Sequence, residues 1–258
     1  MTDTSNSVAL VVGGSSGMGL ETARLLRARG LDLILLSSNA DKLEAARADL
    51  AAAPGGAIDV EAVDLYDQAA VGAFIARLDA EPRHVTHLVN AAGTFKPTPF
   101  LEHTPVDYDA YLGLNRALFF ITQAAARNMA QHGGGSMVNI GSMWAQQAIK
   151  ATPSSAYSMA KAGLHALTQH LAMELADAGI RVNAVSPAVV VTPIYGAFID
   201  PAEIEDTLTS GFGAFHPIGR VGRPQEIART VDFLLSDDAG WVTGAVWDID
   251  GGVMAGRN

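Results

Sequence analysis

A regular alternation of short apolar segments with longer amphipathic ones runs through this chain of 258 residues and constrains its fold more than any other feature. The apolar segments are brief and rich in Val, Ile and Leu. We expect strands at residues 8–12, 33–36, 58–63, 85–90, 136–140, 180–185 and 242–249. We expect helices at residues 18–29, 41–52, 67–80, 105–131, 155–178 and 224–236. Because the strands are almost continuously apolar, they are typical of a sheet covered on both faces. This order predicts an α/β fold, a doubly wound sheet of seven parallel strands with helices on both faces.

Residues that commonly begin or end helices stand at several of the expected boundaries. Asp41 and Asp67 can cap the helices that follow them, and Pro224 suits a first helical turn. Gly30 and Gly179 can end the helices that precede them.

No repeat, low-complexity tract or change in composition divides the chain, so we expect a single domain over residues 1–258. Residues 187–216 fit neither the strand pattern nor the helix pattern. Connections of this length are uncommon in compact domains and are often functional. We therefore expect a lid over the functional site there.

Composition excludes several classes of function. With 17 basic and 27 acidic residues, the formal charge is −10, which disfavours nucleic acids and anionic membranes as partners. The 49% of apolar residues against 17% of charged ones is typical of a folded chain with a full core. The absence of cysteine excludes disulfides, thiol nucleophiles and thiolate metal sites.

Signals for targeting, membrane insertion and metal binding are also missing from the sequence. Residues 1–6 are polar, and the longest apolar stretches fall far short of the about 20 residues that span a bilayer. His165 and His170 lie five positions apart, which is not the spacing of a helical metal pair. We expect a cytoplasmic protein without a metal.

A glycine cluster follows the first expected strand and precedes the first helix, in the segment Gly13-Gly14-Ser15-Ser16-Gly17-Met18-Gly19. Gly13, Gly17 and Gly19 permit a tight turn, a close approach of backbone N–H groups to a pyrophosphate, and close packing of helix on strand. The helix N-terminus adds partial positive charge. This position in a β-α-β unit predicts a dinucleotide-binding turn.

Tyr157 and Lys161 stand four positions apart in an expected helix, so their side chains share one face. An ammonium beside a phenol stabilises the phenolate, and we expect it to lower the pKa of Tyr157. The pair is therefore suited to proton transfer near neutral pH.

With these motifs the chain resembles the short-chain dehydrogenase/reductase family over nearly its whole length. The resemblance extends to five further segments in the expected order: Asn90-Ala91-Ala92-Gly93, Leu114-Asn115-Arg116, Asn139-Ile140-Gly141-Ser142, Ser186-Pro187-Ala188 and Asp250-Gly251-Gly252. It implies a Rossmann-type fold and an NAD(P)-dependent oxidoreductase that interconverts a carbonyl and a secondary alcohol.

The resemblance implies a catalytic role for four residues. Tyr157 would be the general acid and base at the substrate oxygen, and Lys161 would lower its pKa and hold the nicotinamide ribose. Ser142 would bind the reacting carbonyl, and Asn115 would anchor a water in a proton relay that reaches Lys161.

The resemblance also implies a set of cofactor contacts. Asp64 would accept from the adenine amino group, Asn90 would lie against the adenosine, and Thr192 would meet the carboxamide. The other cofactor-binding candidates are Gly13, Ser15, Ser16, Gly17, Met18, Gly19, Ser37, Ser38, Asn39, Leu65, Ala91, Ala92, Gly93, Tyr157, Lys161, Pro187 and Val190.

The chain departs from the usual family pattern at a few positions, with Val12 in place of Thr, Ala91 in place of the second Asn and Ala188 in place of Gly. In addition, Ser142 lies 15 positions before Tyr157, a couple more than is usual. Ser154 and Ser155 are therefore alternatives to Ser142.

The segment after the second strand bears on which nicotinamide cofactor is used. NAD enzymes usually place an acidic residue there, whereas this chain has Ser37, Ser38 and Asn39. The missing carboxylate removes repulsion of a 2′-phosphate, and all three side chains can donate to one. We expect NADP(H) to be favoured over NAD(H).

The substrate is expected to be an apolar small molecule. The candidate pocket residues, chosen by position, are Thr94, Phe95, Met143, Trp144, Ile149, Tyr195 and Phe198, with Ser142 and Tyr157 at the reacting carbonyl. One alternative is a 3-oxoacyl-[acyl-carrier-protein] reductase, although its acidic carrier normally docks on a basic patch. Another is a dinucleotide-sensing regulator without catalysis, since fold does not dictate function.

The helix expected at residues 155–178 has two apolar sides. Leu164, Leu171 and their neighbours form one side, and Met159, Ala166 and Met173 lie on a roughly opposite one. Because such a helix needs a second partner besides the sheet, we expect a homo-oligomer, a dimer or a tetramer.

Overall fold

The structure is a computed structural model that describes residues 6–150 and 152–256. In this part of the chain, seven parallel strands form one sheet in the order β3-β2-β1-β4-β5-β6-β7. The strands are β1 (Ser7–Val12), β2 (Asp32–Ser37), β3 (Ile58–Ala62), β4 (His84–Asn90), β5 (Gly135–Ile140), β6 (Ile180–Pro187) and β7 (Val246–Ile249). The strand order reverses between β1 and β4, where ligands bind in open α/β sheets. This confirms the predicted doubly wound, seven-stranded fold.

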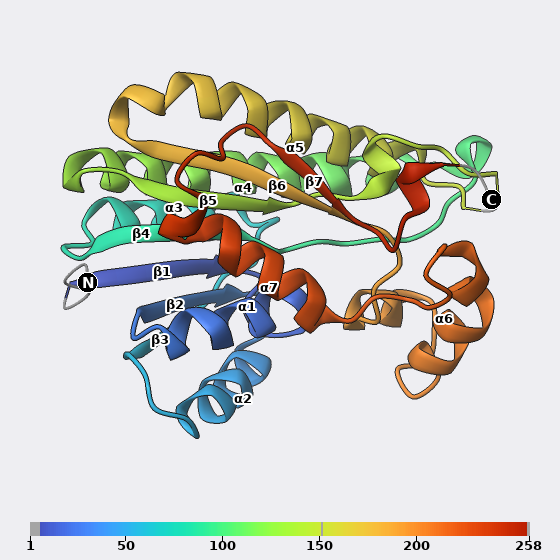
Figure 1. Cartoon of the computed structure of the whole chain (residues 1–258), viewed down its shortest axis with the longest axis horizontal. Helices are drawn as coiled ribbons and strands as arrows, with labels where there is room; N and C mark the ends of the chain where they lie inside the picture. Colours follow the sequence, from blue (N-terminus) through green and yellow to red (C-terminus); the bar gives the residue numbers. More distant parts are fainter. Residues whose placement is uncertain (1–5, 151, 257–258) are drawn as a thin grey trace.

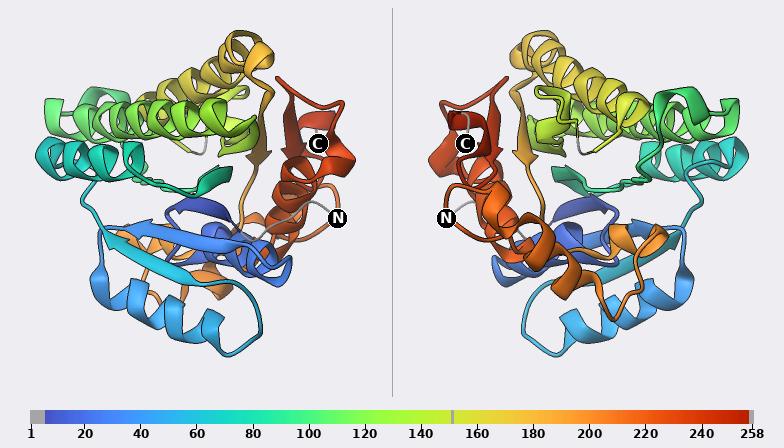
Figure 2. Two further views of the ribbon diagram at one scale, coloured as in Figure 1. Left: turned by 90° about the vertical axis from the view of Figure 1, so that its left-hand side faces the viewer. Right: turned by 90° about the vertical axis from the view of Figure 1, so that its right-hand side faces the viewer.

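Helices cover both faces of the sheet (Figures 1 and 2). Their bounds are α1 (Gly17–Ala28), α2 (Ala40–Ala51), α3 (Gln68–Asp79), α4 (Pro105–His132), α5 (Ser155–Glu174), α6 (Ile204–Phe212) and α7 (Pro224–Leu235). The apolar residues of α3, α4 and α5 pack in one core cluster with the sheet, and those of α1, α2 and α7 pack in another. Alternate residues of β1 enter the two clusters, Leu10 in the first and Val11 in the second. This explains why the strand is apolar without interruption.

Most expected helix boundaries are confirmed. The Asp67 side chain accepts from two backbone N–H groups of α3, Pro224 begins α7, and Gly30 and Gly179 have positive φ angles just beyond helical turns. The expectation for Asp41 is wrong. Because α2 begins at Ala40, its cap is Asn39, whose side chain accepts from the backbone N–H of Lys42.

Two elements in the C-terminal half, β7 and α5, have different bounds from those expected. β7 begins at Val246 and not at residue 242, because Gly244 turns with φ +72° and donates its N–H to the carbonyl of Val182. α5 ends at Glu174, and a 3-10 turn at Ala176–Ala178 completes the segment that was expected to be helical.

The segment 187–216 contains a helix that the sequence pattern did not reveal. After a 3-10 turn at Pro193–Ala197, α6 stands beyond the carboxyl ends of the strands, outside the two helical layers (Figure 1). Its buried Ile204 and Leu208 pack in a third apolar cluster with Trp144 and Val189. The described part of the chain contains no helix that is long and apolar enough to span a membrane.

Candidate active site

The turn between β1 and α1 is shaped by contacts that leave no room for side chains. Gly13 has φ +87°, and a Cβ atom there would lie 2.5 Å from the backbone nitrogen of Ala92. A Cβ atom at Gly19 would lie 2.2 Å from the carbonyl oxygen of Gly13. The N–H of Gly13 donates to the carbonyl of Leu36 over 2.7 Å. The turn is therefore packed, backbone to backbone, between the ends of three neighbouring strands.

A groove opens above this turn, across the point where the strand order reverses. Many of the expected cofactor residues line it, namely Gly13, Ser15, Ser16, Gly17, Met18, Ser37, Ser38, Asp64, Leu65, Ala91, Ala92, Gly93 and Thr192. Its glycine floor and the N-terminus of α1 fit a pyrophosphate. The residues present therefore fit a nicotinamide dinucleotide.

Seven expected cofactor residues do not line this groove. Gly19 packs against the backbone of Gly13 within the turn, and Tyr157 and Lys161 lie on α5. Asn39 uses its side chain to cap α2. Asn90 is buried and donates to Thr122 and Asn139, so it stabilises the interior behind the groove. Pro187 and Val190 line the neighbouring cavity described below.

Lys42 is a groove residue that sequence reasoning missed. Its exposed side chain stands on the first turn of α2, beside Ser37 and Ser38, and the Ser15 hydroxyl donates to that of Ser37 over 2.9 Å. The only sign of this role in the sequence was the position of the lysine, five residues after the end of β2. Lys42 places a cation at the end of the groove where the acidic residue of NAD enzymes would stand.

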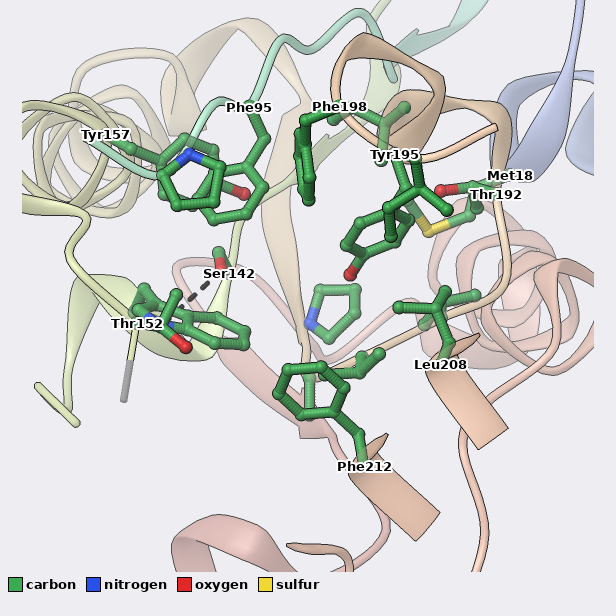
Figure 3. Close-up of a pocket in the computed structure, with 18 of the residues that line it drawn as sticks. Met18, Phe95, Ser142, Thr152, Tyr157, Thr192, Tyr195, Phe198, Leu208 and Phe212 are labelled. Carbon is green, nitrogen blue, oxygen red and sulfur yellow. Dashed lines mark hydrogen bonds between the residues drawn. The ribbon is translucent and has the colours of Figure 1, made fainter. Parts of the chain in front are cut away.

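A second, apolar cavity adjoins the groove, and Met18, Thr192 and Ile194 line both. Ser142 follows β5, and Tyr157 lies in the first turn of α5. Figure 3 shows both residues at the wall of the cavity, and a hydrogen bond with Ser142 is one of the influences on the pKa of Tyr157. The Ser142 hydroxyl also accepts from the backbone N–H of Trp144 over 3.3 Å.

Among the described residues that line this cavity, Ser142 is present and the alternatives Ser154 and Ser155 are not. The Ser154 hydroxyl lies 3.2 Å from that of Ser158. Thr152, from the longer connection before α5, lines the cavity.

Lys161 lies one helical turn after Tyr157, with its Nζ 5.8 Å from the centroid of the phenol ring. The ammonium group donates to the carbonyl oxygen of Ile140 over 2.7 Å. Burial lowers the pKa of Lys161 to about 8. Asn115, on α4, donates its side-chain N–H to the carbonyl of Ala160 over 2.8 Å, next to this lysine.

The pKa of Tyr157 differs from the expectation. Burial raises it to about 12, and a hydrogen bond with Ser142 partly opposes this. The net shift is opposite to the expected lowering, because burial outweighs the stabilisation that the ammonium of Lys161, hydrogen-bonded to the Ile140 carbonyl, gives to the phenolate.

Aromatic rings form much of the cavity wall. Phe95 lies at their centre, with ring centroids 4.8 Å from Tyr157, 5.9 Å from Phe198, 6.4 Å from Tyr195 and 6.4 Å from Trp144. Figure 3 shows the Tyr195 hydroxyl pointing into the cavity. Burial raises the pKa of Tyr195 well above its ordinary value. No charged side chain is found among the described residues that line the cavity.

Three expectations for the pocket need correction. Thr94 lines the dinucleotide groove instead of the cavity. Met143 is fully buried, and Ile149 packs in the third apolar cluster and does not line the cavity. Neighbouring residues of the same loop thus face different sites. Elsewhere, the described residues contain no cluster of three metal-ligating side chains.

The chain is similar to known oxidoreductases over nearly its whole length. A family model described as Enoyl-(Acyl carrier protein) reductase matches residues 12–254. Galactitol 2-dehydrogenase (L-tagatose-forming) of Cereibacter sphaeroides is 35% identical, covering 95% of this chain and 93% of that protein. A solved short chain dehydrogenase/reductase family protein is 35% identical with a TM-score of 0.82, covering 96% of this chain and 97% of its own. The structure of a gluconate 5-dehydrogenase from Burkholderia cenocepacia, solved with NADP and tartrate, is 28% identical with a TM-score of 0.83. The match covers 97% of this chain and 96% of that one.

Proposed function

The chain belongs to the short-chain dehydrogenase/reductase family, and we propose that four residues, Tyr157, Lys161, Ser142 and Asn115, carry its reaction. It is an NAD(P)-dependent oxidoreductase that interconverts a carbonyl and an alcohol. Membership in this family of enzymes disfavours the alternative of a dinucleotide sensor without catalysis. The observation that carries the assignment is that Tyr157 and Ser142 lie together at the wall of a cavity that meets the dinucleotide groove.

The mechanism follows from the protonation states of these side chains. When bound, the nicotinamide supplies or accepts a hydride. Tyr157, with a pKa of about 12, holds its proton at neutral pH and donates it to the carbonyl oxygen during reduction. Ser142 donates a hydrogen bond to the same oxygen and polarises the carbonyl. The ammonium of Lys161 favours the phenolate that remains, and Asn115 holds α4 against α5 beside this lysine.

The preferred cofactor is NADP(H). Lys42 supplies a cation, and Ser15, Ser37 and Ser38 supply hydroxyl donors, at the groove end where a 2′-phosphate would lie. An ammonium and several hydroxyls form charge-assisted hydrogen bonds to a phosphate. The NADP in the similar gluconate 5-dehydrogenase structure agrees with this preference.

The substrate is an uncharged, apolar ketone or secondary alcohol, with Trp144 and Tyr195 among the residues that bind it. Its cavity wall is aromatic, and the described lining residues supply no charge to neutralise a carboxylate or phosphate. A carrier-protein ketoreductase is the second candidate, since the matching family model is described by a carrier-protein reaction. The formal charge of −10 disfavours docking of an acidic carrier.

The chain forms a homo-oligomer, a dimer or a tetramer. On α5, Met159 is 57% exposed and Met173 is 82% exposed, on the side that faces away from the sheet. On the adjacent α4, Phe119 and Phe120 are also exposed. Apolar side chains gathered on two neighbouring helices are typical of a covered surface.

A substrate panel tests the proposed function. Uncharged ring ketones and their carboxylated counterparts are offered with NADPH and with NADH, and the nicotinamide absorbance is followed. We expect turnover of the uncharged ketones, fastest with NADPH. An enzyme that turned over only the carboxylated members would contradict the substrate class. Absence of turnover with any carbonyl or alcohol would contradict the proposed reaction.

A further inference from the structure

His216 is a buried histidine, 3% exposed, whose ring joins two parts of the substrate cavity wall. The backbone N–H of Val189, just after β6, donates to its Nε2 over 3.3 Å. Its Nδ1 lies 2.8 Å from the carbonyl oxygen of Phe212, the last residue of α6. Both Val189 and Phe212 line the cavity. The ring therefore joins the end of α6 to the segment that leaves the sheet.

These two partners fix the protonation state of the ring. A backbone N–H can only donate and a carbonyl oxygen can only accept. Nδ1 must therefore carry the hydrogen, and Nε2 carries none and acts as the acceptor. A second proton, on Nε2, would point at the N–H of Val189, so the charged form of His216 cannot keep both bonds.

The charged side chains near His216 are hydrogen-bonded to partners other than the histidine. Arg220, Glu226 and Asp250 line a small cavity together with the His216 ring. Arg220 binds Glu226 through two hydrogen bonds, at 2.8 Å and 2.6 Å. The carboxylate of Asp250 accepts from the backbone N–H groups of Gly252 and Met254. The Phe215 ring lies against the histidine edge to face, with centroids 5.2 Å apart.

The rest of the Val189 backbone is also held. Its carbonyl oxygen accepts from the N–H of Gly222 over 2.9 Å, and its side chain packs with Leu208 of α6 in the third apolar cluster. The bond to His216 therefore fixes the position of Val189, in the cavity wall, relative to the end of α6. If the bond is lost, Val189 is left with a buried and unpaired N–H group.

We propose that His216 is a positioning residue for substrate binding, which holds α6 over the cavity only in its neutral, Nδ1-protonated form. This inference rests on the proposed function insofar as the cavity is the substrate site. Acidification then weakens substrate binding, because the two hydrogen bonds of the neutral ring cannot both be kept, and it has little effect on the hydride-transfer step itself.

Two substitutions of similar size separate this role from simple packing. His216→Leu fills the space but makes neither bond. In His216→Gln, the side-chain oxygen can accept from Val189 and the nitrogen can donate to Phe212, at any pH. We expect His216→Leu to raise the KM for an uncharged ketone about tenfold, since one to two hydrogen bonds are lost. We expect kcat to change less than about twofold, and His216→Gln to restore KM.

The pH dependence is the second readout. With saturating NADPH, the KM of the wild type should be higher under acidic conditions than at neutral pH, whereas that of His216→Gln should be the same. Equal pH dependence in the two proteins would overturn the inference, and so would a glutamine variant as impaired as the leucine variant.

Hydrogen exchange makes the test independent of turnover. In the full chain at neutral pH, amides of residues 204–215 should exchange faster in His216→Leu and at the wild-type rate in His216→Gln. Unchanged exchange in the leucine variant would overturn the inference. A wild type that turns over no carbonyl would instead count against the proposed function, and the exchange comparison would still decide the role of His216.

Discussion

The ammonium group of Lys161 is hydrogen-bonded to the carbonyl oxygen of Ile140, the last residue of β5, over 2.7 Å. This bond fixes the charge between the end of a strand and the first turns of α5. Its Nζ lies 5.8 Å from the centre of the Tyr157 ring. The lysine is thus held by the scaffold and does not depend on the phenol for its position.

Tyr157→Phe should abolish most turnover while leaving cofactor binding intact. Loss of a general acid typically costs about 10² to 10⁴ in rate. Steady-state kinetics and NADPH fluorescence titration measure the two effects. Tyr111→Phe is the matched control, because its ring lies 5.8 Å from that of Tyr157 while its hydroxyl is bonded to the backbone of Lys96. Similar losses in both variants would contradict the role of Tyr157.

The rate of ketone reduction should fall above about pH 8. Burial lowers the pKa of Lys161 to about 8, so the ammonium loses its proton as the pH rises through that value. Tyr157, with its pKa near 12, stays protonated over this range. The profile of kcat/KM reports groups of the free enzyme and is the measurement to make. A profile that stays flat to about pH 10 would show that the charge of Lys161 is not required.

Lys42→Ala should lower kcat/KM with NADPH and leave the value with NADH nearly unchanged. One charge-assisted contact to a phosphate is worth about tenfold to hundredfold. Lys96→Ala removes another exposed lysine, one that pairs with Asp107, and serves as the control. Equal losses with both cofactors would place Lys42 outside the 2′-phosphate site.

Stability should decline as the pH falls below about 6.5. Burial lowers the pKa of His87 to about 3, so in this range the unfolded chain binds a proton that the folded chain does not. Protonation therefore favours unfolding, by about 2 kcal/mol between pH 6.5 and pH 5. Burial also lowers the pKa of His165 to about 4, which adds to the effect.

Urea unfolding at the two pH values measures this dependence. His87→Leu should make the free energy of unfolding depend less on pH. His170→Leu replaces an exposed histidine on α5 in the same way and should not. An unchanged pH dependence in His87→Leu would contradict the assignment.

Ala166→Arg should convert the oligomer to smaller species. Ala166 is exposed on α5 between Met159 and Met173, and a buried, unpaired guanidinium at an interface is strongly unfavourable. Ala48→Arg places the same charge on the exposed side of α2 as a control. Light scattering gives the masses. A wild type that is already monomeric would refute the proposed assembly.

The sheet was predictable because its pattern is local and repeated. The apolar runs of the buried strands, together with Gly30, Asp67 and Pro224, specify element type and boundaries without knowledge of distant contacts. α6 was missed because only Ile204 and Leu208 are buried on it, and they pack against segments that are remote in sequence. The early start expected for β7 failed because its apolar run continues through the Gly244 turn.

The site was predictable where chemistry is tied to spacing along the chain. The Gly13 turn and the pair Tyr157 and Lys161 are of this kind. Lys42, the groove position of Thr94 and the raised pKa of Tyr157 depend on how loops and helices pack, which spacing does not encode. The same holds for His216, whose partners Val189 and Phe212 come from different segments.

The aromatic wall also gives the molecule a built-in optical probe. Of the three tryptophans, Trp144 lines the cavity, Trp247 stacks on Phe233 and Trp241 is fully exposed. Replacing Trp241 and Trp247 by phenylalanine would leave one indole, whose emission changes when a molecule displaces water beside it. Ligand entry could then be followed in real time without an attached dye, even in a variant that performs no chemistry.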